Sequence, residues 1–369
     1  MRNILLLIIA FTLCLPALTN AQEQDSVPTY KIGLRTGVGF IIPHNRRMSF
    51  VAYQHIGKRE IYLEKNTFGQ QAWHHRYGFP KMGLSLTYYQ LNNSRHLGNA
   101  FSFAPYVNFA LLNRRKLDLH LRTALGGGYL EKPFDVESNH KNTAIGSKFN
   151  LYFSISFEAN IDLYKNIGIS FGASFSHFSN TAFQKPNLGI NIPTIESGLY
   201  YRLGKKRQLI LKEEDKLKNR QSSWVLTTGG GMNQTLRTVD KKHFANALLI
   251  GREKQVNYKS SIGASLDLFH NPGRRKSAAL DSINIRKGFE NIQFGLSLYH
   301  VLHMGRLNVI AQTGYYIRSK DKDVGNIYQM IGGRIRVNHR WNGFFALKTH
   351  LARAEYLLVG ISYQLKNEK

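Results

Sequence analysis

A histidine and a serine stand two residues apart near the middle of the chain, at His177 and Ser179. An imidazole beside a hydroxyl is the pair that serine hydrolases use, because the ring nitrogen removes the proton from the oxygen that attacks a carbonyl carbon. Side chains two residues apart on a β-strand leave the same face of the sheet. The spacing therefore predicts a nucleophile and a base on one face, provided that this segment is a strand.

The residues before this pair have the alternation of a strand. From position 167 to position 176, odd positions are apolar and even positions are glycine or serine. The apolar residues are Ile167, Ile169, Phe171, Ala173 and Phe175. A period of two residues puts all of them on one face. His177 and Ser179 continue the odd series, so the predicted pair lies on the apolar face of the strand.

The same period recurs along the chain, and no long segment has the 3.6-residue period of an amphipathic helix. The clearest example is 148–162, where the odd positions carry Phe, Leu, Phe, Ile, Phe, Ala and Ile. Soluble β-sandwiches also alternate, but their strands average about 5–6 residues. Longer alternating strands of about 9–11 residues, with aromatic pairs such as Tyr88-Tyr89 near their ends, are typical of transmembrane barrels. We expect an all-β, antiparallel transmembrane β-barrel of about 14 strands, within a range of roughly 12–16.

The N-terminus predicts export. Residues 1–21 contain Arg2, an apolar run over 4–13 and a small-residue site that ends at Ala21, the pattern of a signal peptide. The apolar run is shorter than the roughly 20 residues that a membrane-spanning helix needs. The chain's one cysteine, Cys14, lies in this leader, so no thiol chemistry is expected in the mature protein. Residues 22–369 show no domain boundary and are expected to form a single outer-membrane barrel.

The charge balance indicates a polyanionic neighbour. The chain has 50 Lys and Arg residues against 23 Asp and Glu residues, a formal net charge of +27. Export argues against nucleic acid, so we expect the phosphorylated lipid surface of a Gram-negative outer membrane. Basic side chains on solvated loops are the plain alternative explanation. No oligomeric state is predicted.

Two short motifs resemble a known family. They are His177-Phe178-Ser179-Asn180 and Pro186-Asn187-Leu188-Gly189-Ile190. They resemble the active-site segment of the outer-membrane lipid A 3-O-deacylases. The wider layout, with Leu347-Lys348-Thr349-His350, is similar to the acyloxyacyl hydrolases. The resemblance implies a barrel that removes an ester-linked acyl chain from lipopolysaccharide, using a serine-hydrolase triad on its outer wall.

The resemblance also implies roles for single residues. Ser179 would be the nucleophile and His177 the general base. Asn180 and Asn187 match positions that the family uses around the oxyanion, and Gly189 would allow a close backbone approach. No cofactor and no metal are implied.

The third member of the triad differs from the family. Where the deacylases carry a glutamate that orients the histidine, this sequence has Asn191. Glu196 is a poor substitute, because its even position points it into the barrel unless Pro193 introduces a bulge. An asparagine orients the base in papain-like proteases, although it lacks the charge that stabilises an imidazolium. We predict His177, Ser179 and Asn191 as the catalytic set, with reduced or lost activity left open.

Two alternative functions stay open. The chain could be a non-enzymatic pore or structural barrel that retains the motif, because polar residues such as Asp118, His120 and Arg122 would also suit a water-filled lumen. It could also be a phospholipase on the same scaffold, since only the lipid head group would differ. The G-x-S-x-G match at 168–172 lies inside a regular strand rather than at a strand–turn–helix junction, so it is not interpreted as a nucleophile elbow.

Overall fold

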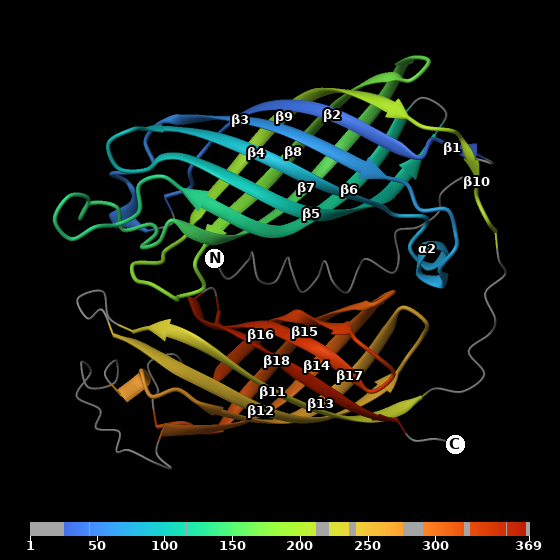
Figure 1. Cartoon of the computed structure of the whole chain (residues 1–369). Helices are drawn as coiled ribbons and strands as arrows, with labels where there is room; N and C mark the ends of the chain where they lie inside the picture. The colour runs from blue at the N-terminus through green and yellow to red at the C-terminus, as the bar shows by residue number, and fades with distance from the viewer. Residues whose placement is uncertain are drawn as a thin grey trace. The chain divides into compact units, whose positions relative to one another are not determined.

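The computed structural model describes residues 26–43, 45–114, 117–211, 221–235, 241–275, 291–320, 325–351 and 353–366. The predicted signal peptide, residues 1–21, lies outside them. The described part is built almost wholly of long antiparallel strands (Figure 1). The first group is β2 (Tyr30–Phe40), β3 (His55–Lys65), β4 (Lys81–Asn93), β5 (Gly98–Asn113), β6 (Leu117–Leu130), β7 (Phe149–Tyr164), β8 (Ile167–Ser179) and β9 (Ile190–Leu203). The second group is β11 (Ser222–Gln234), β12 (Lys242–Gln255), β13 (Ser260–His270), β14 (Ile292–Met304), β15 (Leu307–Arg318), β16 (Ile327–Arg336), β17 (Trp341–His350) and β18 (Arg353–Lys366).

Each group closes on itself. In the first barrel β2 pairs with both β3 and β9, and in the second β11 pairs with both β12 and β18. Every pair of neighbours along the chain is antiparallel, which is an up-and-down meander. The predicted fold class, an all-β antiparallel membrane barrel, is confirmed.

The number of barrels differs from the expectation. From the sequence we expected one barrel of about 14 strands over residues 22–369, whereas the described strands form two closed barrels of eight. Strand length and alternation are the same in one large barrel and in two small ones. Closure depends on which strands pair, and nothing in the segment between β9 and β11 distinguishes a linker from another loop. The two-residue period therefore predicts the class of the fold but not how the strands are divided into barrels.

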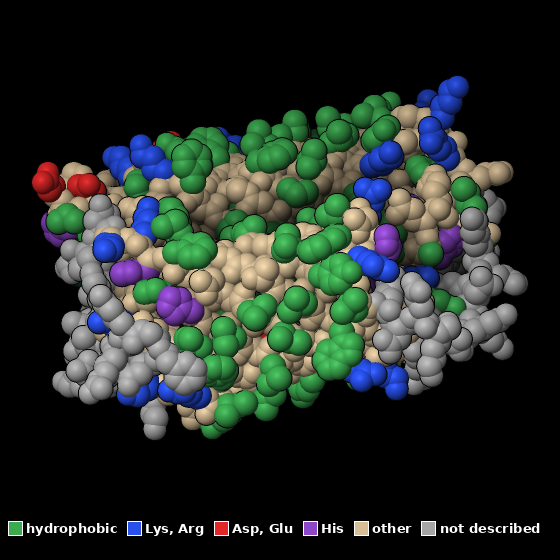
Figure 2. Space-filling view, turned by 60° about the horizontal axis from the view of Figure 1, so that its bottom comes forward, with side chains coloured by type: hydrophobic (Ala, Val, Ile, Leu, Met, Phe, Trp, Pro, Cys, Tyr) green, Lys and Arg blue, Asp and Glu red, His purple; other side chains and the backbone are tan. Residues whose placement is uncertain are grey.

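The walls of both barrels are apolar outside and polar inside. On β2 the outward residues Leu34 and Val38 are 62% and 68% exposed, whereas the inward Lys31 and Arg35 are buried. Figure 2 shows hydrophobic side chains spread over the strands and Lys and Arg gathered toward their ends. This inside-out distribution is the one that a surrounding bilayer requires.

The interior of the first barrel is filled by ion pairs. Arg35 donates two hydrogen bonds to Glu158, of 2.5 and 2.6 Å. Arg122 lies 2.7 Å from Glu60 in the same layer. An eight-stranded barrel is just wide enough for side chains to fill its interior. The packed charges of the described residues therefore disfavour a water-filled channel through this barrel.

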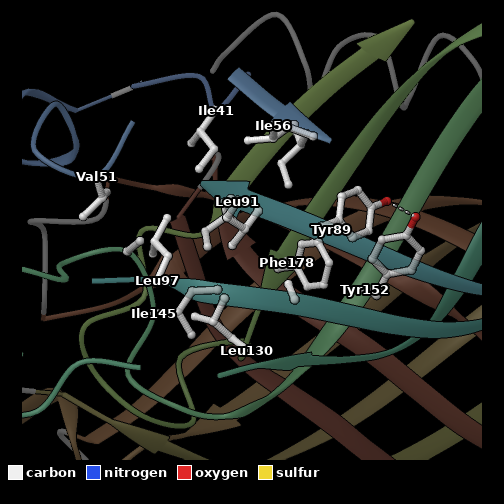
Figure 3. Packing of buried hydrophobic residues seen from close by; sticks show 14 of the residues in the cluster. Ile41, Val51, Ile56, Tyr89, Leu91, Leu97, Leu130, Ile145, Tyr152 and Phe178 are labelled. Carbon is white, nitrogen blue, oxygen red and sulfur yellow. Dashed lines mark hydrogen bonds between the residues drawn. The ribbon is translucent and has the colours of Figure 1, made fainter. Parts of the chain in front are cut away.

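An apolar core occupies the end of the first barrel where β8 terminates (Figure 3). Phe178 is fully buried there between the rings of Tyr89 and Tyr152, whose hydroxyls lie 2.8 Å apart. A Cβ atom on Gly128 would lie 2.6 Å from the Phe178 ring, so the ring fills the space that this glycine leaves. Phe178 stands between the two predicted catalytic residues, and its packing fixes the end of β8.

Three short elements lie at the opposite end of this barrel. Helix α2 (Ala72–Arg76) buries Trp73, and strand β1 (Ser26–Val27) pairs with β10 (Arg207–Gln208). Among the residues described, no helix has the length and apolar character needed to cross a membrane.

Candidate active site

The predicted base and its orienting residue face each other across two strands. His177 of β8 and Asn191 of β9 are direct partners in the strand register. The His177 Nδ1 atom lies 2.5 Å from the Asn191 Oδ1 atom. Asn191 is buried and His177 is half-buried. The structure therefore brings together the two residues that the alternation assigned to one face.

The outward direction of this face follows from its neighbours on β8. Ile167 and Phe171, at odd positions, are 46% and 49% exposed on the outer wall. Ser174 and Ser176, at even positions, are buried and hydrogen-bond to interior groups. His177 continues the outward series, as the parity of the sequence predicts.

The hydrogen bond to Asn191 decides which ring nitrogen of His177 holds the proton. An amide oxygen only accepts hydrogen bonds, so the Nδ1 atom of His177 carries the proton in this contact. The Nε2 atom is then left with a lone pair. This is the tautomer in which a histidine can accept the proton of a serine hydroxyl.

Asn187 ties Ser179, the predicted nucleophile, to the loop between β8 and β9. Its Nδ2 atom donates to the Ser179 Oγ atom at 3.0 Å, and its Oδ1 atom accepts from the backbone N–H of Asn180, also at 3.0 Å. Ser179 is 9% exposed. The side chain of Asn180 donates its Nδ2 atom to Ser147 Oγ at 2.9 Å. The side-chain amide of Asn187 lies against the serine in this arrangement.

Gly189 packs against the imidazole. Its φ angle is +80°, a conformation that residues with a Cβ atom adopt only at a cost. A Cβ atom built on Gly189 would lie 2.7 Å from the His177 Cε1 atom. The backbone of Gly189 therefore lies close to the His177 ring, and a side chain at this position would collide with it.

The loop 131–148, between β6 and β7, also supports the site, a role that we did not predict from the sequence. Ala144 accepts a hydrogen bond from the Gly189 N–H at 3.0 Å, and Ile145 forms an isolated β-bridge with Asn187. Asn142 is fully buried, and its Oδ1 atom accepts from the N–H of Ala144 at 3.0 Å. A polar loop gives no periodic signal, so only the three-dimensional contacts identify this support.

Glu196 does not belong to the site. Its side chain lies inside the barrel, 2.6 Å from the Lys58 Nζ atom, and it also bonds Ser174. The prediction that its even position turns it inward is confirmed. Glu196 serves the interior ion-pair network, and Asn191 alone of these two residues contacts the histidine.

Three further histidines lie on elements other than those of the candidate site. His74 and His75 lie in the short helix α2, and His303 bonds Ser261 and Asn308 at 2.8 Å each. Within the described ranges, no group of three or more His, Cys, Asp or Glu side chains is arranged to hold a metal ion.

Two family models match the chain in tandem. Residues 59–200 match "Lipid A 3-O-deacylase (PagL)", which covers most of the first barrel and all of the site. Residues 222–367 match "Acyloxyacyl hydrolase, C-terminal domain", which spans the second barrel. The chain belongs to the lipid A 3-O-deacylase and acyloxyacyl hydrolase family. It is an ester hydrolase of the outer membrane.

Solved structures also match the chain, at low similarity. Neisserial surface protein A matches 49% of this chain and 100% of its own, with 8% identity and a TM-score of 0.34. The outer membrane enzyme PagL matches 45% and 97%, with 16% identity and a TM-score of 0.31. A Rh. blastica porin mutant matches 92% and 100%, with 8% identity and a TM-score of 0.18. These scores are low, so the architecture rests on this chain's own strand pairing. None of the curated proteins matches.

Proposed function

We propose that this deacylase-family protein removes an ester-linked acyl chain from lipid A, with Ser179 as nucleophile and His177 as base. The observation that carries the proposal is the hydrogen bond between His177 Nδ1 and Asn191 Oδ1 on the outward face, two residues from the serine. The outward face of β8 directs His177 toward lipid. A proton on its Nδ1 atom leaves the Nε2 atom able to act as the base.

The reaction would follow the serine-hydrolase course. His177 Nε2 takes the proton of Ser179 as the Oγ atom attacks the ester carbonyl. The tetrahedral intermediate collapses, and the sugar oxygen leaves with the proton returned by His177. Water, deprotonated by His177 in turn, attacks the acyl-serine and releases the fatty acid. Asn191 would hold the imidazole in place throughout, without the full charge of a carboxylate.

The developing oxyanion needs hydrogen-bond donors. The Nδ2 atom of Asn187 is the side-chain donor already directed at Ser179. When the Oγ atom bonds to carbon, this amide would turn to the new oxyanion, which lies one bond from the attacked carbon. Donors of this kind commonly contribute about 10²–10³ in rate. Asn180 would contribute its backbone N–H, which lies in the same cluster.

Mass spectrometry of lipid A from outer membranes that contain the protein would test the proposal. We expect loss of one acyl chain with the wild type and intact lipid A with Ser179→Ala. Ser197→Ala is the matched control, because Ser197 is an exposed outward serine of the neighbouring strand β9. It should deacylate like the wild type.

Phospholipids from the same membranes distinguish the second candidate. Intact lipid A together with Ser179-dependent release of fatty acid from phospholipids would replace the proposal with a phospholipase. No change in either lipid, with both barrels folded, would contradict hydrolysis altogether.

A further inference from the structure

A polar pocket of about 410 Å³ lies on the first barrel, apart from the catalytic residues. Its lining comes from the end of β4, the start of β5 and the start of the loop 131–148. The side chains that matter here are Gln90, Asn92, Ser94, Asn99, Glu131 and Lys132. No large apolar side chain lines it, which excludes an acyl chain as its natural occupant.

Hydrogen bonds hold the wall of this pocket in place. The Glu131 carboxylate accepts from the backbone N–H of Asn99 at 2.7 Å and from the Asn99 side chain at 3.3 Å. Lys132 Nζ donates to the backbone carbonyl of Ser94 at 2.6 Å. A pocket whose walls are already ordered loses little conformational entropy when a ligand binds.

Other polar groups of the lining remain available. Asn92 donates its Nδ2 atom to the His55 carbonyl, which leaves its Oδ1 atom as an acceptor. In the part of the chain that the structure describes, neither the Gln90 amide nor the Ser94 hydroxyl makes a hydrogen bond, and both side chains are exposed. The pocket thus offers amide donors, amide acceptors and a hydroxyl together, the set that matches sugar hydroxyl and amide groups.

The pocket lies at the same end of the barrel as Ser179, because the β4–β5, β6–β7 and β8–β9 connections of a meander share one end (Figure 1). Neighbouring strands are about 4.8 Å apart, so the end of β6 is roughly 10 Å and the start of β5 roughly 15 Å from Ser179. A disaccharide head group spans such a distance.

The loop 131–148 connects the two places directly. It begins at Glu131 and Lys132 in the pocket and ends at Ser147, which accepts a hydrogen bond from Asn180 beside the nucleophile. Between them, the Asn142 side chain donates to the carbonyls of Lys132 at 2.8 Å and His96 at 3.1 Å. One ordered loop therefore sets the position of both the pocket wall and the site.

We propose that this pocket binds the sugar head group of the glycolipid whose acyl ester is cleaved at Ser179. The inference rests on the proposed function, which supplies the ester, and adds the site that recognises the saccharide. Binding the head group there would place an acyl ester over Ser179 while the acyl chains stay along the apolar outer wall.

The test compares two substrates of the full-length protein, lipid A and a p-nitrophenyl acyl ester that has no sugar. In the double variant Gln90→Leu/Ser94→Ala we expect the KM for lipid A to rise about tenfold, as the loss of neutral hydrogen bonds predicts. The kcat/KM for the simple ester should stay unchanged. Glu137→Gln, an exposed position at the tip of the same loop, is the control and should alter neither value. An unchanged KM for lipid A in the double variant would overturn the proposal.

A binding measurement separates this proposal from the catalytic one. The probe is the fully deacylated lipid A disaccharide, added to full-length Ser179→Ala protein and followed by saturation-transfer NMR. We expect binding that the Gln90→Leu/Ser94→Ala changes weaken about tenfold. Sugar binding without hydrolysis of either ester would contradict the proposed function and support the pocket. Hydrolysis with no pocket-dependent sugar binding would support the proposed function and contradict the pocket.

Discussion

The Nδ1 atom of His177 and the Oδ1 atom of Asn191 lie 2.5 Å apart at directly paired positions of β8 and β9. Two strands of a closed barrel hold this contact, so neither residue depends on a flexible loop for its position. An amide thus occupies the place where a carboxylate would stabilise a charged imidazolium. The arrangement fixes the orientation of the His177 ring but places no negative charge beside it.

Replacing Asn191 by aspartate should therefore raise activity. The change keeps the size of the side chain and adds the charge that stabilises the imidazolium in the transition state, so we expect kcat to increase about 10-fold or more. Asn191→Leu should lower kcat about 10-fold or more, because the ring loses its orienting acceptor. Rates of fatty-acid release from lipid A, measured on folded barrels, check both. A slower aspartate variant would show that the charge is not needed.

Asn187 offers a test of oxyanion stabilisation. Asn187→Ala removes the Nδ2 donor directed at Ser179, and we expect kcat to fall about 10²–10³-fold while KM changes little. Asn180→Ala is the comparison, since its side chain donates to Ser147 and the substitution keeps the backbone N–H that donates to Asn187. Equal losses in the two variants would argue against a special role for the Asn187 amide.

Gly189→Ala should impair the base without changing any polar group. The new Cβ atom would lie 2.7 Å from His177 Cε1, at a φ of +80° that alanine disfavours. We expect a loss of kcat of about 10-fold or more, because a displaced ring misaligns proton transfer. Activity close to that of the wild type would mean that the loop relaxes. The control is Gly127→Ala on β6, where a Cβ atom would meet no heavy atom within 4 Å.

Glu196→Gln should separate stability from catalysis. The substitution removes the negative charge that lies 2.6 Å from the buried Lys58 ammonium, and removal of one charge of a buried pair typically costs about 3 kcal/mol of unfolding free energy. Because Glu196 lies inside the barrel, kcat should stay within about twofold of the wild type. Urea unfolding in lipid vesicles measures the first quantity and lipid A deacylation the second. A large fall in kcat at unchanged stability would assign Glu196 to the site after all.

Much of this arrangement was predictable because it follows from the two-residue period. The alternation placed His177 and Asn191 outward and Glu196 inward, and the strand pairing agrees. The alternation of residues does not show which strands pair to close a barrel, so one barrel was expected where the described strands form two. It also says nothing about loops. The supports that Asn142 and Ser147 give to the site depend on contacts between segments without a regular pattern.

The outward position of His177 also determines how enzyme and substrate meet. A reaction at the outer wall of a barrel draws its substrate from the surrounding leaflet by lateral diffusion, so the relevant concentration is the mole fraction of glycolipid in the membrane plane. Anything that tightens the packing of that leaflet, such as divalent cations that bridge lipid phosphates, would slow the encounter without touching the protein. The fluidity of the lipid phase would then limit the rate of hydrolysis.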